Sequence, residues 1–179
     1  MLLASLLLAW ASGNGGKVFL TTEEALKLAF PECTVERKTH YLTERQLEEA
    51  RRLAQAPVAS AVVPAYSASR DGKLVGMAYF DTHKLRTQAE TLMVVVDPEG
   101  RVKRVEVLSF DEPLDYMPKG GWYAQFQGRT LDAELNLKRG IQGVTGASLT
   151  ARATTEAVRR VLALHQTLHP RPQPEPQRP

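Results

Sequence analysis

The sequence predicts an α+β fold, in which an antiparallel β-meander follows N-terminal helices and a C-terminal helix packs on the sheet. Three observations lead to this prediction: two helix-start signals near the N-terminus, four β-type segments separated by turn residues, and a long amphipathic segment near the C-terminus. Helices and strands that are grouped along the chain, not alternating, are typical of α+β domains. A chain of 179 residues has the length of one domain with a hydrophobic core.

Two short helices are expected before the sheet. Residues 21–24 read Thr-x-x-Glu and residues 43–46 read Thr-x-x-Gln, the spacing of a capping box in which each side chain bonds to the other residue's backbone N–H. Proline cannot continue a helix. The first helix is therefore expected to end at Phe30, before Pro31, and the second to end before Pro57.

Four segments with the composition of β-strands follow. They are separated by turn signals, including Asp71-Gly72 and the Asp-Pro-Glu-Gly run at residues 97–100. The expected strands are residues 58–66, 73–80, 91–96 and 101–110. The third is continuously apolar, which favours a central strand, and the fourth alternates, which favours one buried and one solvated face.

The last predicted element is a helix over residues 151–168. Its apolar stripe has a period of 3.6 residues and is expected to pack on the sheet. The stripe consists of Thr154, Ala157, Val158, Val161, Leu162 and Leu168. Arg159 and Arg160 are expected on the outer side of this helix.

The composition argues against nucleic-acid binding, disulfide bonds and metal sites. Acidic and basic residues are interspersed and the formal net charge is +3, so no nucleic-acid partner is expected. Cys33 is the single cysteine, so neither an internal disulfide nor a cysteine-based metal site is expected. His165 and His169 have the i,i+4 spacing of a metal site, but we interpret them as two solvated histidines near a helix C-terminus.

Both ends of the chain differ from the rest. Residues 1–11 combine an apolar stretch with Ala9-Trp10-Ala11, a small-x-small cleavage pattern, and we interpret them as a signal peptide. They are too short for a membrane span, which needs about 20 apolar residues; a buried or frayed N-terminal segment is the alternative. Residues 169–179 are rich in proline and are expected to be extended. We therefore expect an exported protein, periplasmic or on the extracytoplasmic face of the membrane, with a single domain over residues 12–168.

The most informative pattern is Thr-Gly-Ala-Ser-Leu-Thr at residues 145–150, directly before the last predicted helix. A Gly-Ala pair allows a tight turn. The helix N-terminus offers unpaired N–H groups and the positive end of the helix dipole, which favour a phosphate. Thr150 places a hydroxyl in the first turn, within reach of such a phosphate. The alternative is an ordinary N-cap by Ser148 or Thr150.

A long irregular connection, residues 109–143, precedes this motif and is rich in aromatic residues. Such long connections in compact domains are usually functional. A flavin needs an apolar or aromatic slot for its ring system and a few polar groups at its edge, and this connection offers both. Trp122 and Phe126 either contact the flavin or pack in the core.

These elements, taken in order, resemble the FMN-binding domain family, which includes the flavin-bearing small subunits of the sodium-pumping NADH:quinone oxidoreductase and of Rnf complexes. Family members carry a turn and strand, an E-T-P-like element, an F-x-G element and an [S/T]-G-A-[S/T]-x-T motif before a final helix. The corresponding elements here are residues 97–100, Glu112-Pro113, residues 126–128 and residues 145–150. The resemblance covers roughly residues 60–165.

The resemblance implies that FMN is attached to Thr150 through a phosphoester bond. It identifies no catalytic residue and no metal ligand in this chain. The remaining cofactor-binding candidates are Thr145, Gly146, Ala147, Ser148, Leu149, Glu112, Pro113, Trp122 and Phe126. A threonine hydroxyl needs a base to become a nucleophile, and the sequence around Thr150 supplies none. A separate flavin transferase, which uses FAD and Mg²⁺, is therefore the implied partner for maturation.

Three departures from the family pattern bear on this attachment. Gln142 stands where an acidic residue is common, Ser148 and Ala151 stand where Thr and Ser are common, and Glu112 is followed directly by Pro113. Noncovalent binding of FMN is therefore an alternative.

The resemblance implies an electron carrier that works between redox partner proteins at the membrane surface, with no small-molecule substrate identified. The redox chemistry would belong to the flavin, and the protein would set its potential and exposure. Two alternatives stay open. One is a noncovalent FMN oxidoreductase that acts on a small molecule, and the other is a non-redox exported binding or sensory module in which the motif only caps a helix.

Overall fold

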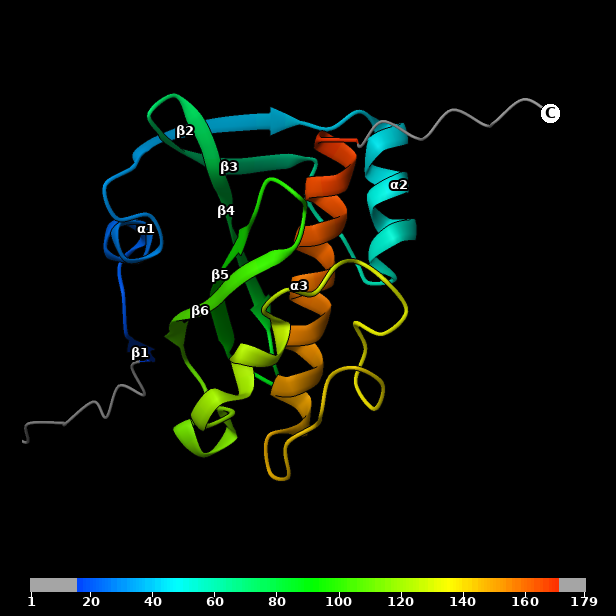
Figure 1. Cartoon of the computed structure of the whole chain (residues 1–179). Helices are drawn as coiled ribbons and strands as arrows, with labels where there is room; N and C mark the ends of the chain where they lie inside the picture. The colour runs from blue at the N-terminus through cyan, green and yellow to red at the C-terminus, as the bar shows by residue number, and fades with distance from the viewer. Residues whose placement is uncertain (1–15, 171–179) are drawn as a thin grey trace, which may run out of the picture.

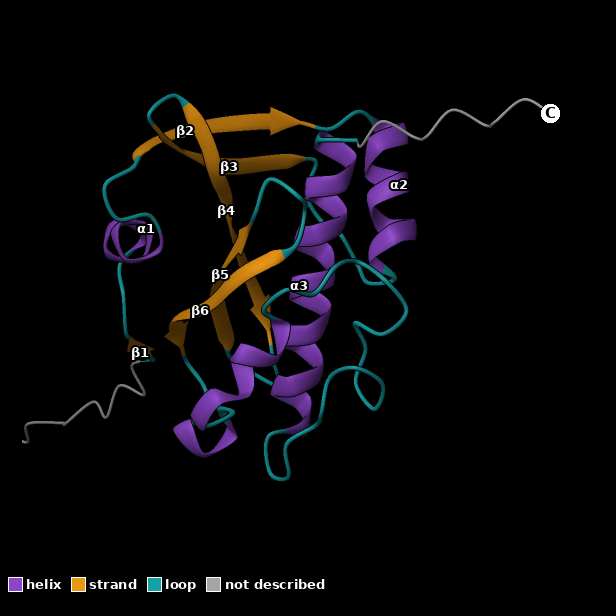
Figure 2. Cartoon of the chain, in the orientation of Figure 1, coloured by secondary structure: helices purple, strands orange, loops and turns teal. Residues whose placement is uncertain are grey.

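The computed structural model describes residues 16–170 and is built on a six-stranded antiparallel sheet (Figures 1 and 2). The strands are β1 Lys17–Val18, β2 Thr34–Tyr41, β3 Val62–Arg70, β4 Lys73–Lys84, β5 Ala89–Val96 and β6 Val102–Phe110. Their order across the sheet is β1-β6-β5-β4-β3-β2. Strands β3 to β6 are neighbours in both sequence and space, so the expected meander and the α+β fold are confirmed.

Helices within residues 16–170 lie before and after this meander. They are α1 Thr22–Ala29, α2 Glu44–Ala54 and α3 Ser148–Leu168, with the 3₁₀ segments η1 Leu114–Tyr116 and η2 Gly120–Phe126. Both predicted capping boxes are present. The Thr21 hydroxyl accepts from the Glu24 N–H at 3.2 Å, and Glu24 Oε2 accepts from the Thr21 N–H at 2.8 Å. Thr43 and Gln46 make the same pair of bonds at 3.3 and 3.0 Å.

Strand β2 was not predicted from the sequence. It pairs along its whole length with β3, from Thr34 opposite Ser69 to Tyr41 opposite Val62. It lies at the edge of the sheet and none of its side chains is fully buried, so it lacks the apolar alternation by which a strand is recognised. Strand β4 also runs farther than predicted, to Lys84 instead of Phe80. Asp81 and His83 are therefore part of the sheet.

The sheet is covered on both faces, as Figure 1 shows: α3 lies on one face and the short α1 on the other. The continuously apolar strand β5 serves both layers. Leu92, Val94 and Val96 belong to the core under α3, whereas Met93 and Val95 belong to the core under α1. This double burial explains why β5 shows no alternation.

The prediction that Arg159 and Arg160 lie on the outer side of α3 is wrong for Arg160, which donates to Asp81 of β4, and the outer side at Arg159 is covered by α2. Helix α2 packs against α3 on the side away from the sheet, so α3 has two buried sides. Arg159 is only 4% exposed. Its guanidinium donates to the backbone carbonyls of Leu53, Ala54, Asp132 and Leu135.

The interpretation of two solvated histidines is also wrong for one of them. His165 is buried, and its Nδ1 lies 2.9 Å from the Tyr79 hydroxyl on β4. His169, one turn later at the end of α3, is exposed. The difference arises because His165 faces the sheet and His169 lies beyond the last turn of the helix.

The predicted signal peptide, residues 1–11, and residues 171–179 of the proline-rich tail lie outside the described residues. Between residues 16 and 170, no helix combines the length and the apolar character needed to cross a membrane. Export and the single-domain boundaries stay predictions.

Candidate functional site

Residues 145–150 form the turn into α3. Gly146 has a φ of +84°, in the left-handed region that glycine adopts without steric cost. Ala147 is the N-cap residue and the helix begins at Ser148. Glycine is therefore required where the chain reverses to enter the helix, and the motif lies at the helix N-terminus as predicted.

The alternative in which Ser148 or Thr150 merely caps this helix is wrong. Ser148 Oγ donates to the Val144 carbonyl at 3.1 Å, and Thr150 Oγ1 donates to the Tyr116 carbonyl at 2.6 Å. No side-chain cap bonds to the first turn of α3. The first-turn N–H groups therefore keep the anion-binding character of an uncapped helix N-terminus.

The two neighbouring residues at the end of the motif differ sharply in exposure. Thr150 is 2% exposed, whereas Leu149 is 53% exposed. Thr150 is covered because its hydroxyl lies against Tyr116, the last residue of η1. We call residues 112–119, which include η1, the cover segment. Access to the Thr150 hydroxyl requires the cover segment to move.

Glu112 anchors the cover segment to the hairpin between β4 and β5. Its Oε1 accepts hydrogen bonds from the Thr87 N–H at 2.7 Å, the Gln88 N–H at 3.0 Å and the Thr87 hydroxyl at 3.1 Å. These hydrogen bonds hold the pKa of Glu112 below its usual value. The bond from the Thr87 N–H has the largest effect and the bond from the Gln88 N–H the next largest. Pro113 comes next and is the N-cap residue of η1, so the Glu-Pro element fixes where the cover segment begins.

Replacing Glu112 with alanine is expected to loosen the cover segment and to weaken the pH dependence of stability in acid. Because the folded-state pKa of Glu112 is depressed, its contribution is present above the unfolded pKa and is lost as the pH falls through the folded pKa. Melting temperatures at pH 6 and pH 3 should therefore differ less in Glu112→Ala than in wild type. Glu99→Ala, at an exposed turn position, is the matched control and should keep the wild-type difference; equal behaviour of the two variants would contradict the anchoring role.

A hollow of about 350 Å³ opens beside the cover segment. Its lining is largely apolar or aromatic and consists of Phe19, Leu114, Met117, Pro118, Lys119 and Tyr123. Met117 follows Tyr116, the residue bonded to Thr150, so the hollow adjoins the motif. Its size and lining suit an aromatic ring system, as in cofactor sites generally.

Trp122 and Phe126 are not among the residues that line this hollow. The Trp122 indole N–H donates to the Gln142 carbonyl at 2.7 Å, and its ring meets Phe126 edge-to-face at 5.3 Å. Phe126 is fully buried. The Gln142 N–H in turn donates to Gln125 Oε1 at 2.9 Å. The Trp122–Phe126 pair thus holds in place the backbone at Gln142, just before the motif. Contact of either ring with the flavin stays a prediction.

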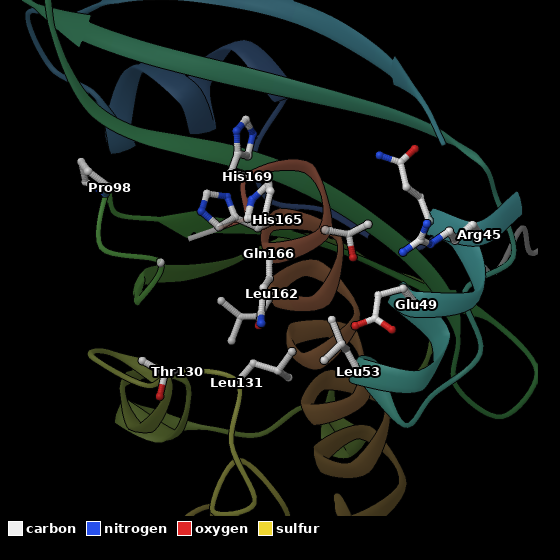
Figure 3. A pocket seen from close by; sticks show the side chains of 14 residues that line it. Arg45, Glu49, Leu53, Pro98, Thr130, Leu131, Leu162, His165, Gln166 and His169 are labelled. Carbon is white, nitrogen blue, oxygen red and sulfur yellow. The ribbon is translucent and has the colours of Figure 1, made fainter. Parts of the chain in front are cut away.

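A larger cavity, of about 900 Å³, lies at the opposite end of α3 (Figure 3). Arg45, Glu49 and Leu53 reach it from α2, and His165 and His169 from the end of α3. His165 is about 22 Å along the helix from Thr150, at 1.5 Å per residue. This cavity contains no residue of the motif or of the cover segment, so its size does not identify it as the flavin site.

Sequence reasoning missed three residues around the motif. Tyr116 is 34 positions from its partner Thr150, and Arg86 lies over the Tyr116 ring at 5.0 Å from its centroid. No local pattern links these residues, because their contacts exist only after folding. Glu90 did leave a signal: it occupies the same strand face as Leu92 and Val94, where an apolar residue is expected.

Comparison with known proteins points to the same part of the chain. Residues 87–163 match the model of a family described as FMN-binding domain. Neither a curated protein nor a solved structure matches the chain significantly. The matched region begins in the β4–β5 hairpin, includes the whole cover segment and ends within α3, so it contains Glu112, Trp122, Phe126 and Thr150. Over residues 87–163, this chain is therefore similar to FMN-binding domains, which supports the resemblance expected from the sequence.

Proposed function

We propose that this protein is exported, carries FMN covalently on Thr150 through a phosphoester bond, and transfers electrons between redox partner proteins at the membrane surface. The observation that carries the proposal is the position of the Thr150 hydroxyl. It lies in the first turn of an uncapped helix, within the region that matches the FMN-binding domain family and next to an apolar hollow.

The residues present fit an FMN group in three respects. The uncapped N-terminus of α3 suits the phosphate. The hollow suits the ring system, and the exposed motif residues Thr145 and Gly146 leave one side open to a partner. When bound, the flavin supplies the redox chemistry, and the chain's own residues hold, orient and partly shield it.

Attachment is assigned to a separate flavin transferase. In that step the Thr150 Oγ1–phosphorus bond forms, the pyrophosphate bond of FAD breaks and AMP leaves. The hydroxyl proton must pass to a base. The hydrogen-bond partner of Thr150 is the Tyr116 carbonyl, which is not a base, so the transferase has to supply one. It also has to displace the cover segment, because Thr150 is 2% exposed.

Noncovalent FMN binding is a second candidate, favoured by the same burial. If the cover segment stays closed, the hollow and the helix N-terminus could hold FMN without an ester bond. Gln142, in place of the acid common in the family, favours this candidate by weakening recognition by the transferase.

The test is the intact mass of the protein after co-expression, with export, alongside a flavin transferase. A gain of one FMN less one water, retained after denaturation, supports the covalent proposal. A yellow protein of unmodified mass that loses its colour on denaturation supports the noncovalent candidate. A colourless protein of unmodified mass contradicts both. N-terminal sequencing of the same sample tests export, since cleavage after Ala11 is expected.

A further inference from the structure

A group of charged side chains is buried between the sheet and α3, outside the motif and the hollow. Glu90 is fully buried, and the His83 side chain is 10% exposed. His83 Nε2 lies 3.1 Å from Glu90 Oε2, and His83 Nδ1 lies 2.9 Å from Asp81 Oδ1. Arg160 of α3 donates to both oxygens of Asp81, at 2.7 and 2.9 Å. We call these four residues the buried network.

The strands fix this arrangement. His83 and Glu90 are cross-strand partners in the β4–β5 register, so their side chains project from the same face of the sheet. Asp81 is two residues before His83 and shares that face. The face is the one that packs under α3, since it also carries Leu92 and Tyr79.

The buried network reaches the candidate flavin site by two hydrogen bonds. Thr154 donates to Glu90 Oε2 at 3.0 Å, and Thr154 lies one helical turn, about 6 Å, beyond Thr150. Tyr123 donates to Glu90 Oε1 at 3.3 Å, and Tyr123 lines the hollow beside the cover segment. Glu90 is therefore one hydrogen bond from the hollow lining and one from the helix that carries Thr150.

The charges of the network balance only when His83 is protonated. The guanidinium of Arg160 offsets the carboxylate of Asp81, which leaves Glu90 opposite His83. Burial acts to lower the pKa of His83, but the hydrogen bond to Asp81 and the negative charge of Glu90 outweigh it, and the net pKa lies above the usual value. Burial, followed by the charge of Glu90, raises the pKa of Tyr123, so Tyr123 stays a neutral donor.

We propose that the His83–Glu90 pair is a buried proton-binding site that couples proton uptake to reduction of the flavin. The inference rests on the proposed function. When bound in the hollow, the flavin would supply the redox centre, and an external reductant would supply its electrons. Glu90 and His83 would then sense the added negative charge through Tyr123, and His83 would bind a proton from water more tightly. The proton would remain on the imidazole, so no bond of this chain breaks.

The charged and polar groups around His83 each strengthen or weaken proton binding to its imidazole. Asp81 on the same strand and Glu90 on β5 attract it. Arg160, from α3, opposes this through its contact with Asp81. Tyr123, from η2, stabilises the carboxylate of Glu90 as a donor. Among the groups near His83, the bound flavin would be the one whose charge changes during function.

The direct test follows the His83 imidazole by NMR in the histidine-labelled, flavin-loaded protein, before and after reduction with dithionite. The proton affinity of His83 is expected to rise on reduction, and each tenfold rise corresponds to about 30 mV in a two-electron potential. An identical titration of His83 in the two states would overturn the inference. This measurement needs no variant, so it stands even if a substitution fails to fold.

Redox titration of variants gives the second readout. His83→Gln is expected to have a lower potential than wild type at low pH and to converge with it above the pH at which His83 loses its proton. Glu90→Gln is expected to raise the potential at high pH, because a buried negative charge is removed. His169→Gln, at the exposed far end of α3, is the matched control and should follow wild type. Parallel pH profiles for His83→Gln and wild type would overturn the coupling.

The two proposals fail in distinguishable ways. A flavin-loaded protein with an unchanged His83 titration contradicts the coupling alone. A protein that takes up no flavin contradicts the proposed function, and the coupling with it.

The same pair predicts how stability depends on pH in the flavin-free protein. Because the folded-state pKa of His83 is raised, its contribution is fully present below the unfolded pKa, about 6.5, and is lost as the pH rises through the folded pKa. Urea denaturation should therefore show a loss of unfolding free energy above neutral pH in wild type that is absent in His83→Gln. The pKa values of His40 and His169 are lowered by partial burial, although His169 remains exposed. Both therefore act in the opposite direction and at lower pH, so they do not mimic this loss.

Discussion

Replacing Thr150 with alanine is expected to abolish covalently bound flavin and to leave the fold intact. Thr150 Oγ1 is the atom that forms the ester bond in the proposed attachment, and alanine has no oxygen in its place. The lost hydrogen bond to the Tyr116 carbonyl costs about 1 kcal/mol. Since a domain is stable by about 5–15 kcal/mol, this loss does not unfold it. Intact mass after co-expression with a transferase, together with circular dichroism, measures both outcomes.

Two matched variants show whether the loss of flavin in Thr150→Ala is due to the missing hydroxyl or to a change elsewhere in the motif. Thr150→Ser keeps a hydroxyl at the same place and should still gain the mass of FMN less water. Ser148→Ala removes the neighbouring hydroxyl, which bonds only to the Val144 carbonyl, and should also be modified. A mass gain in Thr150→Ala, or its loss in Ser148→Ala, would contradict the assignment of Thr150.

Replacing Arg159 with methionine is expected to cause the largest loss of stability among single substitutions in α3. Its guanidinium is buried and donates to carbonyls of both α2 and the connection that leads to the motif. Hydrogen bonds to charged groups contribute about 1.5–3 kcal/mol each, and methionine leaves several carbonyls without a donor. We expect the free energy of unfolding to fall by roughly 4 kcal/mol and the melting temperature by roughly 10 °C.

Controls on the same helix define this effect. Arg152 is exposed, so Arg152→Met should change the free energy of unfolding by no more than about 0.5 kcal/mol. Arg159→Lys should lie between wild type and Arg159→Met, because a single ammonium cannot reach carbonyls on both sides as the planar guanidinium does. A loss below about 1 kcal/mol in Arg159→Met would show that water replaces the guanidinium.

Arg159 also connects stability to function. The Asp132 and Leu135 carbonyls that it binds belong to the connection between η2 and the motif. Loosening this connection should disturb the turn at Gly146 and slow flavin attachment at Thr150. In the proposed function, therefore, the packing of α2 on α3 positions the motif as well as stabilising the fold.

Features written in a few neighbouring residues could be predicted from the sequence. The capping boxes at Thr21 and Thr43, the meander and the position of the motif at the start of the last helix were correct, although the helix begins at Ser148 and not at Ala151. Each depends on local chemistry: a side chain that satisfies a nearby N–H, an alternation imposed by the pleat, or a glycine at a positive φ. The family match over residues 87–163 includes the Glu112-Pro113 element, residues 126–128 and the motif at residues 145–150.

The tertiary structure alone decided which polar groups are buried and what they bond to. The helix period places Arg159 and Arg160 on the outer side, but α2 and the end of β4 provide their partners. Thr150 looks like a cap, but Tyr116, 34 residues away, takes its hydroxyl. The sheet register brings His83 to Glu90. These contacts join distant segments, and burial makes an unpaired polar group costly enough to require them, so no local pattern in the sequence could encode them.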